Sequence, residues 1–252
     1  MTTDSTQIVP SGIKEENITF NGDSATMNGY IAFDTATMNK RPAVLILPEW
    51  WGMTEYPKMR ARELAKLGYV AMAMDIYGNG QTAETPDEAG NAAGPYYKDP
   101  QKAKTRIDTA LATLKACPQA DTNKLAIIGY CFGGGLALNV ARMGEDVKGV
   151  VSFHGSLIGT PANKDLLKAK ILVCHGGADT FVPQADVDKF KKQMDSIKAD
   201  YTFKVYDGAT HAFTNPNADE KAKKYKMPIA YNPAADSASW KDMKDFFDRI
   251  FK

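Results

Sequence analysis

The stretch Gly-Tyr-Cys-Phe-Gly-Gly at residues 129–134 joins a predicted buried strand, residues 124–129, to a predicted helix, residues 133–143. Gly-x-nucleophile-x-Gly between a strand and a helix is the pattern of a nucleophile elbow, here with cysteine in the place of serine. The turn strains the backbone of the nucleophile, so the residues two before and two after it must be small, as these glycines are. The helix N-terminus that follows favours the thiolate form of Cys131.

Outside this stretch, short apolar runs typical of buried parallel strands alternate with segments of helical periodicity. The predicted strands cover residues 43–47, 69–74, 124–129, 147–153, 169–174 and 202–206, and the predicted helices cover residues 54–67, 101–116, 133–143, 183–198 and 240–250. Two β-prone runs flank Asn-Gly-Asp at residues 21–23, which predicts an N-terminal hairpin. This alternation implies an α/β fold with a mostly parallel sheet, helices on both faces, and antiparallel pairing only at the N-terminal edge.

The chain is predicted to form one domain over residues 1–252, because it has no internal repeat and no linker long or polar enough to separate two domains. Residues 1–15 are polar and lack periodicity, so we expect a mobile or surface-draped tail. The segment 75–100 is rich in glycine and alanine and is longer than most connections. We therefore interpret it as a long loop that forms a wall of the site.

Composition excludes several classes of protein. Apolar residues make up 44% and charged residues 24% of the 252 positions, values typical of a soluble globular domain. The net charge of +1 and the lack of a basic run argue against nucleic acid as a partner. The sequence has no apolar stretch of roughly 18–20 residues, the length of a membrane span, and no N-terminal secretion signal. We therefore expect a cytoplasmic protein without a membrane partner.

The three cysteines, Cys117, Cys131 and Cys174, are an odd number without close spacing, which argues against a disulfide framework and fits a reducing compartment. Cys174 lies inside a predicted strand and Cys117 at a predicted helix end, so both are interpreted as small buried hydrophobic residues. The same interpretation is open for Cys131, although the elbow glycines have no other obvious role.

Four reactive residues, Glu49, Cys131, Asp179 and His211, each lie shortly after the end of a different predicted strand. Ligands bind at the carboxyl ends of the strands in such a sheet, so these side chains can converge although they are far apart in the chain. The order nucleophile, acid, histidine is the chain order of α/β-hydrolases. A thiol needs histidine as a base, and the imidazole needs a carboxylate to fix its tautomer. The sequence therefore predicts a triad of Cys131, His211 and Asp179.

An oxyanion formed at this site needs two backbone N–H donors. The N–H of Phe132, directly after the nucleophile, is one expected donor. The N–H of Trp50, just after the strand 43–47, is the other. We therefore predict that these two groups form an oxyanion hole.

Simpler roles stay open for several of these residues. Asp179 can cap the following helix, His211 can be a structural loop histidine, and Glu49 can be a solvated loop residue. His154 and His175 also lie near strand ends. We interpret both as supporting or structural residues, because the triad already has its base.

Several separate stretches also carry a resemblance to a known family. They are Pro-Glu-Trp-Trp-Gly at 48–52, Asp-Ile-Tyr at 75–77, Gly-Tyr-Cys-Phe-Gly-Gly at 129–134, Gly-Gly-Ala-Asp at 176–179 and Gly-Ala-Thr-His-Ala-Phe at 208–213. Through them the chain resembles the dienelactone hydrolase family, a cysteine-using branch of the α/β-hydrolases, over nearly its whole length beyond the tail. The resemblance implies a catalytic triad of Cys131, Asp179 and His211. It also implies that Glu49 holds the resting thiol until substrate displaces it.

Two positions depart from the pattern of that family. Members that act on anionic dienelactones carry arginine two residues after the Asp-x-Tyr tyrosine and four residues after the histidine, where this chain has Asn79 and Asn215. Asparagine cannot supply the charge of a bidentate arginine clamp, so we expect a neutral ester or lactone as substrate. Aromatic residues near the predicted rim favour an apolar pocket. The residues assigned to this pocket are Trp51, Tyr77, Asn79, Phe153, Phe181, Phe213 and Asn215.

Other functions stay open at this point. The same thiolate can attack a thioester or a phosphotriester, and the aromatic set can be ordinary core packing. Thiolate, imidazole and carboxylates are also zinc ligands, so a non-catalytic metal- or ligand-binding module is a second hypothesis. A scaffold protein that lost its chemistry is a third. The elbow favours a hydrolase, for which we expect a small-molecule substrate, no metal, no other cofactor, and a monomer or weak homodimer.

Overall fold

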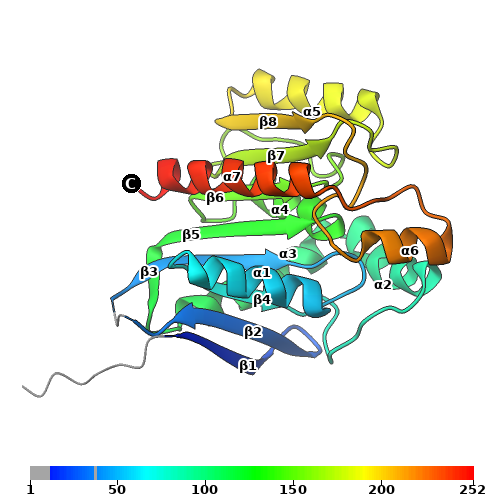
Figure 1. Ribbon diagram of the computed structural model, residues 1–252. Helices are drawn as coiled ribbons and strands as arrows, with labels where there is room; N and C mark the ends of the chain where they lie inside the picture. Colours follow the sequence, from blue (N-terminus) through cyan, green and yellow to red (C-terminus); the bar gives the residue numbers. More distant parts are fainter. Residues whose placement is uncertain (1–11, 37–38) are drawn as a thin grey trace, which may run out of the picture.

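Eight strands form one sheet in the structure, a computed structural model that describes residues 12–36 and 39–252. The strands are β1 (Ile13–Asn21), β2 (Thr26–Asp34), β3 (Arg41–Leu47), β4 (Val70–Met74), β5 (Ala120–Tyr130), β6 (Gly149–Phe153), β7 (Lys170–Gly176) and β8 (Tyr201–Tyr206). Their order across the sheet is β1-β2-β4-β3-β5-β6-β7-β8 (Figure 1). Pairing is antiparallel from β1 to β2 and from β2 to β4, and parallel between all other neighbours. The predicted mostly parallel sheet with an antiparallel N-terminal edge is confirmed.

Helices cover both faces of the sheet, as predicted. They are α1 (Glu55–Lys66), α2 (Pro86–Lys98), α3 (Pro100–Lys115), α4 (Phe132–Arg142), α5 (Gln184–Ser196), α6 (Ala218–Tyr225) and α7 (Pro233–Ile250). On one face, Leu64 of α1 and Phe247 of α7 belong to the same buried cluster. On the other, Leu111 of α3, Val140 of α4 and Phe190 of α5 share a second cluster. None of the helices in the described ranges is both long and apolar enough to cross a membrane.

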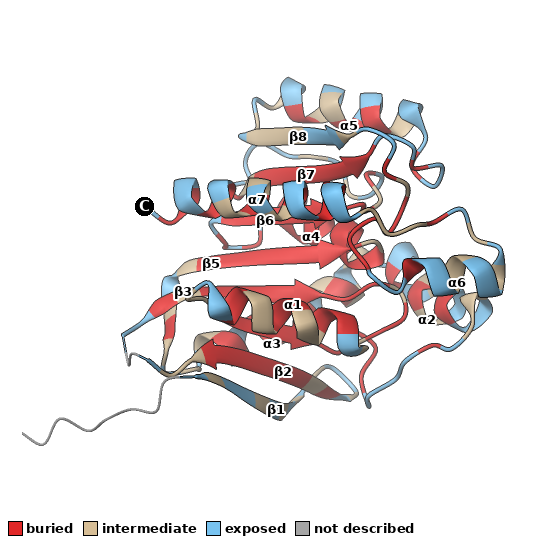
Figure 2. Ribbon diagram, viewed as in Figure 1, coloured by how far each residue is buried: buried red, intermediate tan, exposed pale blue. Residues whose placement is uncertain are grey.

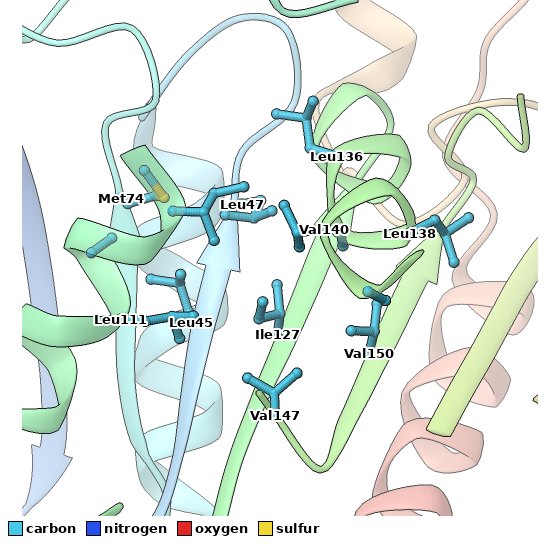
Figure 3. Close-up of a cluster of buried hydrophobic side chains, with 14 of the residues drawn as sticks. Leu45, Leu47, Met74, Leu111, Ile127, Leu136, Leu138, Val140, Val147 and Val150 are labelled. Atoms are coloured by element: carbon cyan, nitrogen blue, oxygen red, sulfur yellow. The ribbon is translucent and has the colours of Figure 1, made fainter. Parts of the chain in front are cut away.

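The central strands are buried on both faces, which explains why they read as continuous apolar runs in the sequence. Every residue of β4 and of β6 is buried, and Figure 2 shows the buried residues concentrated along the central strands, whereas the edge strands β1 and β8 are intermediate or exposed. Leu45, Ile127 and Val150 come from three different strands and pack against Leu111 and Val140 in one cluster (Figure 3). Removing such apolar surface from water stabilises the fold by roughly 25 cal/mol per Å².

Helices α2 and α6 lie at the end of the sheet where the parallel strands terminate (Figure 1), and the sequence analysis predicted neither of them. The segment 75–100 was predicted as a loop, but residues 86–98 form α2. Oγ1 of Thr85 accepts from the N–H of Glu88 at 3.3 Å, and Oε2 of Glu88 accepts from the N–H of Thr85 at 3.2 Å. This capping box, with proline in the first turn, is a helix start signal. Two glycines and an internal proline weaken the helical pattern that follows it.

The predicted tail, residues 1–15, lies mostly outside the described residues. Its last three residues belong to β1, where Ile13 pairs with Asp34 of β2. The prediction of a mobile tail is therefore wrong for residues 13–15, because backbone hydrogen bonds to the neighbouring strand order them.

Candidate active site

The elbow has the geometry of a tight strand-to-helix turn. Cys131 lies between the end of β5 and the start of α4, with φ 52° and ψ −116°. A φ in this left-handed region is strained for cysteine, and such strain concentrates at functional sites. A Cβ on Gly129 would lie 2.1 Å from the Gly133 carbonyl oxygen, and a Cβ on Gly133 would lie 2.4 Å from the Leu47 carbonyl oxygen. The close approach of backbone to backbone therefore requires both glycines.

A continuous chain of hydrogen bonds joins Cys131, His211 and Asp179. Nε2 of His211 lies 3.0 Å from Sγ of Cys131, and Nδ1 of His211 lies 2.9 Å from Oδ2 of Asp179. The other carboxylate oxygen of Asp179 accepts from the N–H of Phe181 at 2.9 Å. Asp179 therefore orients the imidazole, whereas the N-cap position of α5 belongs to Pro183.

Burial and the neighbouring negative charges shift the pKa of His211 in opposite directions. Burial disfavours its charged form, but the negative charge of Cys131 and the hydrogen bonds with Asp179 and Cys131 outweigh that effect and raise the pKa of His211 to about 10. A protonated imidazole, which is a hydrogen-bond donor, therefore stands beside the sulfur at neutral pH. Adjacent side chains can thus supply both a nucleophile and a proton donor.

The turn after β3 is held against the elbow. The N–H of Gly133 donates to the Pro48 carbonyl oxygen at 3.0 Å, and Oη of Tyr77 donates to the Trp50 carbonyl oxygen at 2.8 Å. Within the part of the chain that the structure describes, the N–H groups of Trp50 and Phe132 donate to no protein acceptor. Both groups are therefore available to a ligand atom at the elbow.

Glu49 is buried, with 3% of its surface exposed, so the alternative of a solvated loop residue is wrong. Its Oε2 accepts from Nδ2 of Asn215 at 2.7 Å. Burial raises the pKa of Glu49, and the hydrogen bond from Asn215 opposes that shift only in part. The sulfur of Cys131 has His211 as its hydrogen-bond partner in this structure, whereas Glu49 is hydrogen-bonded to Asn215.

A cavity of about 250 Å³ opens onto Cys131 and His211. Its size fits a small ligand, and its walls are mostly aromatic and aliphatic. Trp51 and Phe181, two of the predicted pocket residues, belong to this lining. The complete lining is Glu49, Trp50, Trp51, Tyr97, Cys131, Ser156, Phe181, Val182, His211, Ala212, Met227 and Ile229.

Three aromatic residues predicted for the pocket lie outside this lining. Phe153 and Phe213 are buried in the core on the α1 and α7 face of the sheet, where Phe153 stacks on Tyr130 with ring centroids 4.8 Å apart. Tyr77 stacks against Phe132 at 5.9 Å. The prediction placed them by their distance from a strand end, whereas packing turned their rings into the core.

The two asparagines predicted for the pocket occupy different places. Asn79 lies against the N-terminal hairpin, where its N–H donates to the Thr26 carbonyl oxygen at 2.6 Å, so the prediction that it faces the substrate pocket is wrong. Asn215 lines a separate polar cavity of about 350 Å³. Glu49 and Trp51 line both cavities. Asn215 therefore acts on the cavity beside Cys131 through its hydrogen bond to Glu49.

Several lining residues were missed by the sequence prediction. Tyr97 lies near the end of α2, with its ring centroid 5.2 Å from that of Phe132. The capping box at residues 85–88 would have located α2, and with it Tyr97. Met227 and Ile229 reach the cavity from the segment between α6 and α7, and no pattern in the sequence marks them.

The described residues provide no set of metal ligands that would support the metal-binding hypothesis. Among residues 12–36 and 39–252, no group of three or more histidine, cysteine, aspartate or glutamate side chains is arranged to hold a metal ion. His175, at the end of β7, packs its ring 5.7 Å from that of Phe203. His154 lies against Cys131, whose N–H donates to Nδ1 of His154 at 3.1 Å.

Comparison with known proteins places most of the chain in one family. The model of the dienelactone hydrolase family matches residues 27–251. A provisionally named carboxymethylenebutenolidase of Aquifex aeolicus is 30% identical over 241 residues, which cover 93% of this chain and 98% of that protein. A protein of the same provisional name from Methylorubrum extorquens is 33% identical over 218 residues, which cover 82% of this chain and 71% of that protein.

Solved structures agree with this assignment. A dienelactone hydrolase-like promiscuous phosphotriesterase from metagenomic libraries has a TM-score of 0.88 and 30% identity, covering 94% of this chain and 98% of that one. A provisionally named dienelactone hydrolase from Klebsiella pneumoniae has a TM-score of 0.81 at 22% identity, covering 94% and 99% of the two chains, and supports the fold. The chain therefore has the α/β-hydrolase fold and belongs to the dienelactone hydrolase family of hydrolases.

Proposed function

We propose that the protein hydrolyses small neutral carboxylic esters or lactones through an acyl-cysteine intermediate. The observation that carries this proposal is the chain of hydrogen bonds from Sγ of Cys131 through His211 to Asp179, at 3.0 and 2.9 Å. Cys131 is the nucleophile, His211 the base and acid, and Asp179 the group that fixes the imidazole tautomer.

In the first half of the reaction, the Cys131 thiolate attacks the ester carbonyl carbon and the carbonyl π electrons move to the oxygen. The N–H groups of Trp50 and Phe132 donate to this oxyanion. The tetrahedral intermediate then collapses, the C–O bond to the leaving group breaks, and Nε2 of His211 protonates the departing alkoxide. The products of this half are an alcohol and an acyl-cysteine.

In the second half, a water molecule enters beside the neutral imidazole. Nε2 of His211 accepts a proton from that water as its oxygen attacks the acyl carbon. The second tetrahedral intermediate expels the Cys131 thiolate and releases the carboxylic acid. His211 is again protonated beside the thiolate, so the resting pair is restored.

The walls of the cavity favour a neutral substrate. Aromatic and aliphatic groups such as Trp51, Phe181 and Ile229 bury apolar parts of a ligand. The acidic Glu49 is held by a neutral amide, and a carboxylate on the substrate would meet no compensating arginine in the lining. A small neutral ester or lactone therefore fits this cavity better than an anionic lactone.

Phosphotriester hydrolysis is a second candidate activity for the same triad. It is favoured by one observation, the name of a structural neighbour, a dienelactone hydrolase-like promiscuous phosphotriesterase with 30% identity to this chain. A thiolate beside a protonated imidazole can attack phosphorus as well as a carbonyl carbon. Thioesters remain a third substrate class for the same nucleophile.

The decisive experiment measures turnover of neutral aryl esters, anionic lactones, thioesters and phosphotriesters by wild type and by Cys131→Ala. We expect the neutral esters to be turned over best. We expect Cys131→Ala to lower kcat by at least about 10³-fold, because the nucleophile is removed. Mass spectrometry of the quenched wild-type protein is expected to show an acyl group on Cys131.

Cys117→Ala is the matched control, because Cys117 is a free, partly buried thiol outside the cavity. It is expected to retain wild-type turnover. Full ester hydrolysis by Cys131→Ala would contradict the proposal. So would stoichiometric zinc in the purified protein together with no activity on any substrate of the panel.

A further inference from the structure

His154 lies against the backbone of the nucleophile. Its Nδ1 accepts from the N–H of Cys131 at 3.1 Å, and the same N–H donates to the Phe153 carbonyl oxygen at 3.0 Å. His154 is 1% exposed, so water does not compete for this hydrogen bond. With φ 41° at His154 and φ 52° at Cys131, two residues in the left-handed region lie side by side at the ends of β6 and β5.

The protonation state of His154 follows from its two partners. A ring nitrogen that accepts a hydrogen bond carries no proton, so the neutral ring has its proton on Nε2. Nε2 lies 2.7 Å from Oγ1 of Thr214, which can accept that hydrogen bond. Burial lowers the pKa of His154 well below its ordinary value, and the positive charge of His211 acts in the same direction. His154 is therefore neutral beside the charged His211.

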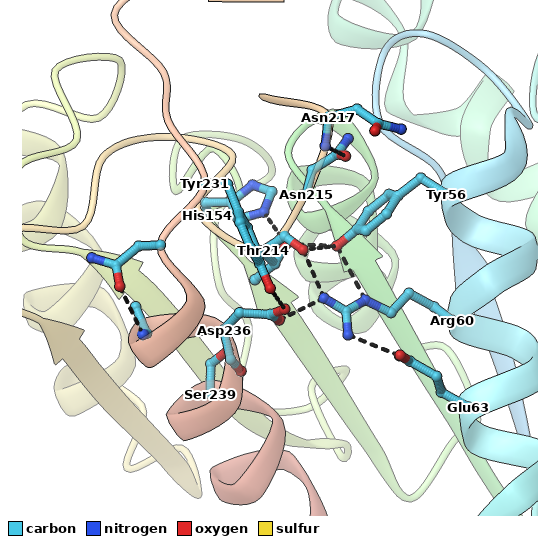
Figure 4. A network of polar contacts seen from close by, with 12 residues as sticks. Tyr56, Arg60, Glu63, His154, Thr214, Asn215, Asn217, Tyr231, Asp236 and Ser239 are labelled. Carbon is cyan, nitrogen blue, oxygen red and sulfur yellow. Dashed lines mark hydrogen bonds and ion pairs between the residues drawn. The ribbon is translucent and has the colours of Figure 1, made fainter. Parts of the chain in front are cut away.

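Thr214 connects His154 to helices α1 and α7 (Figure 4). Oη of Tyr56 lies 2.6 Å from Oγ1 of Thr214, and Nη2 of Arg60 donates to the Thr214 carbonyl oxygen at 2.7 Å. The same Nη2 donates to Oδ1 of Asp236 at 2.5 Å. Thr214 is fully buried, so these hydrogen bonds fix its position, and with it the orientation of the His154 ring.

We propose that His154, held in its Nε2–H tautomer by Thr214, is a positioning residue that keeps the Cys131 backbone in its strained conformation. The φ and ψ of Cys131 set the direction of the next peptide group, whose N–H belongs to Phe132. Under the proposed function, on which the kinetic part of this inference rests, that N–H binds the oxyanion. By accepting the hydrogen bond from the Cys131 N–H, Nδ1 of His154 thus keeps the N–H of Phe132 directed toward the cavity.

The tautomer is tested directly by ¹⁵N NMR of the imidazole rings in the substrate-free protein. The chain has three histidines, so His175→Gln and His211→Gln variants assign the signals. At neutral pH we expect His154 to carry a proton on Nε2 and none on Nδ1. A proton on Nδ1, or a doubly protonated ring, would overturn the proposal.

The kinetic consequence is tested with two substitutions of one residue. Thr214→Val removes the hydroxyl group with little change in volume, whereas Thr214→Ser keeps it. We expect Thr214→Val to lower kcat for a neutral aryl ester by about 10- to 100-fold, with little change in KM, because a misplaced oxyanion donor weakens transition-state binding. Thr214→Ser is expected to recover most of this loss.

Alkylation of Cys131 by iodoacetamide separates this role from a general disturbance of the site. Alkylation needs the thiolate but no oxyanion hole, so its rate and pH profile are expected to be the same in Thr214→Val and wild type. Unchanged kcat in Thr214→Val, or a parallel loss of alkylation and turnover, would overturn the proposal. Absence of ester turnover in the wild type would instead contradict the proposed function, and the NMR measurement would still decide the tautomer.

Discussion

Nδ2 of Asn215 donates a 2.7 Å hydrogen bond to Oε2 of Glu49, so a neutral amide holds a buried carboxyl group at the wall of the cavity. An arginine in the place of Asn215 would hold Glu49 as a carboxylate by its charge. With a neutral amide as the partner, burial has a larger effect on the pKa of Glu49 than the hydrogen bond does, and the pKa is raised. The charge at this wall of the cavity therefore depends on whether Glu49 is ionised. A substitution of Glu49 therefore tests how the cavity selects between neutral and anionic substrates.

Glu49→Gln is expected to raise kcat/KM for anionic esters about tenfold relative to neutral esters, equivalent to about 1.4 kcal/mol. The substitution replaces the ionisable carboxyl group of the lining with a neutral amide, which keeps an oxygen that accepts from Asn215 and can no longer carry a negative charge. Turnover of neutral esters is expected to stay within about threefold of wild type, because the sulfur of Cys131 is hydrogen-bonded to His211 and not to Glu49.

The control for this experiment is Asn79→Asp, which changes charge at the N-terminal hairpin, away from the cavity. It is expected to leave the ratio of anionic to neutral ester turnover unchanged. A loss of neutral-ester turnover greater than about tenfold in Glu49→Gln would show that the carboxyl group acts on the thiol, as the family resemblance implies.

His211 is expected to stay protonated at neutral pH and to lose its proton about pH 10. Its folded-state pKa is raised above the ordinary 6.5, so its contribution to stability is complete below pH 6.5 and is lost as the pH rises through about 10. In Cys131→Ala the negative charge that raises the pKa is gone, so the pKa of His211 is expected to fall toward 6.5.

An NMR titration of the His211 ring in both proteins measures this difference. His175 is followed in the same spectra: burial is the main cause that lowers its pKa and the charge of His211 lowers it further, so its titration is expected to change less than that of His211. An identical His211 titration in wild type and Cys131→Ala would show that the sulfur carries no negative charge in the resting protein.

Gly133→Ala is expected to destabilise the protein by about 1–3 kcal/mol, because a Cβ at this position would lie 2.4 Å from the Leu47 carbonyl oxygen and force the backbone apart. Gly94→Ala in α2 is the matched control. A Cβ there meets nothing within 4 Å, so the substitution is expected to stabilise by about 0.5–1 kcal/mol. Urea unfolding measures both changes, and equal stability of the two variants would refute the role of Gly133.

Tyr97→Ala is expected to raise KM for neutral aryl esters up to about tenfold with little change in kcat, because Tyr97 belongs to the lining of the cavity and not to the proposed triad. Its ring forms part of the cavity lining from the end of α2. Leu67→Ala, at an exposed position after α1, is the control and is expected to change neither constant. A selective loss of kcat in Tyr97→Ala would mean that α2 positions the elbow instead.

Most of the architecture was predictable because its signals are local. The buried strands are continuous apolar runs, because helices cover both faces of the sheet and leave these strands no polar face. The elbow is encoded by Gly129 and Gly133, whose missing side chains allow backbone contacts that no other residue permits. Helix α2 escaped prediction because its glycines and proline mask the periodicity, although Thr85 and Glu88 mark its start.

The fold class, the strained turn at Cys131, and the order of Cys131, Asp179 and His211 along the chain follow from the sequence alone, because they depend on neighbouring residues and on strand order. Which side chains meet depends on how the whole chain packs. This packing turned Phe153 and Phe213 into the core, brought Ile229 to the cavity, and paired Glu49 with Asn215. It also placed His154 behind the Cys131 N–H. The direction of a side chain in a loop depends on contacts with segments far away in the chain, and no local pattern records those contacts.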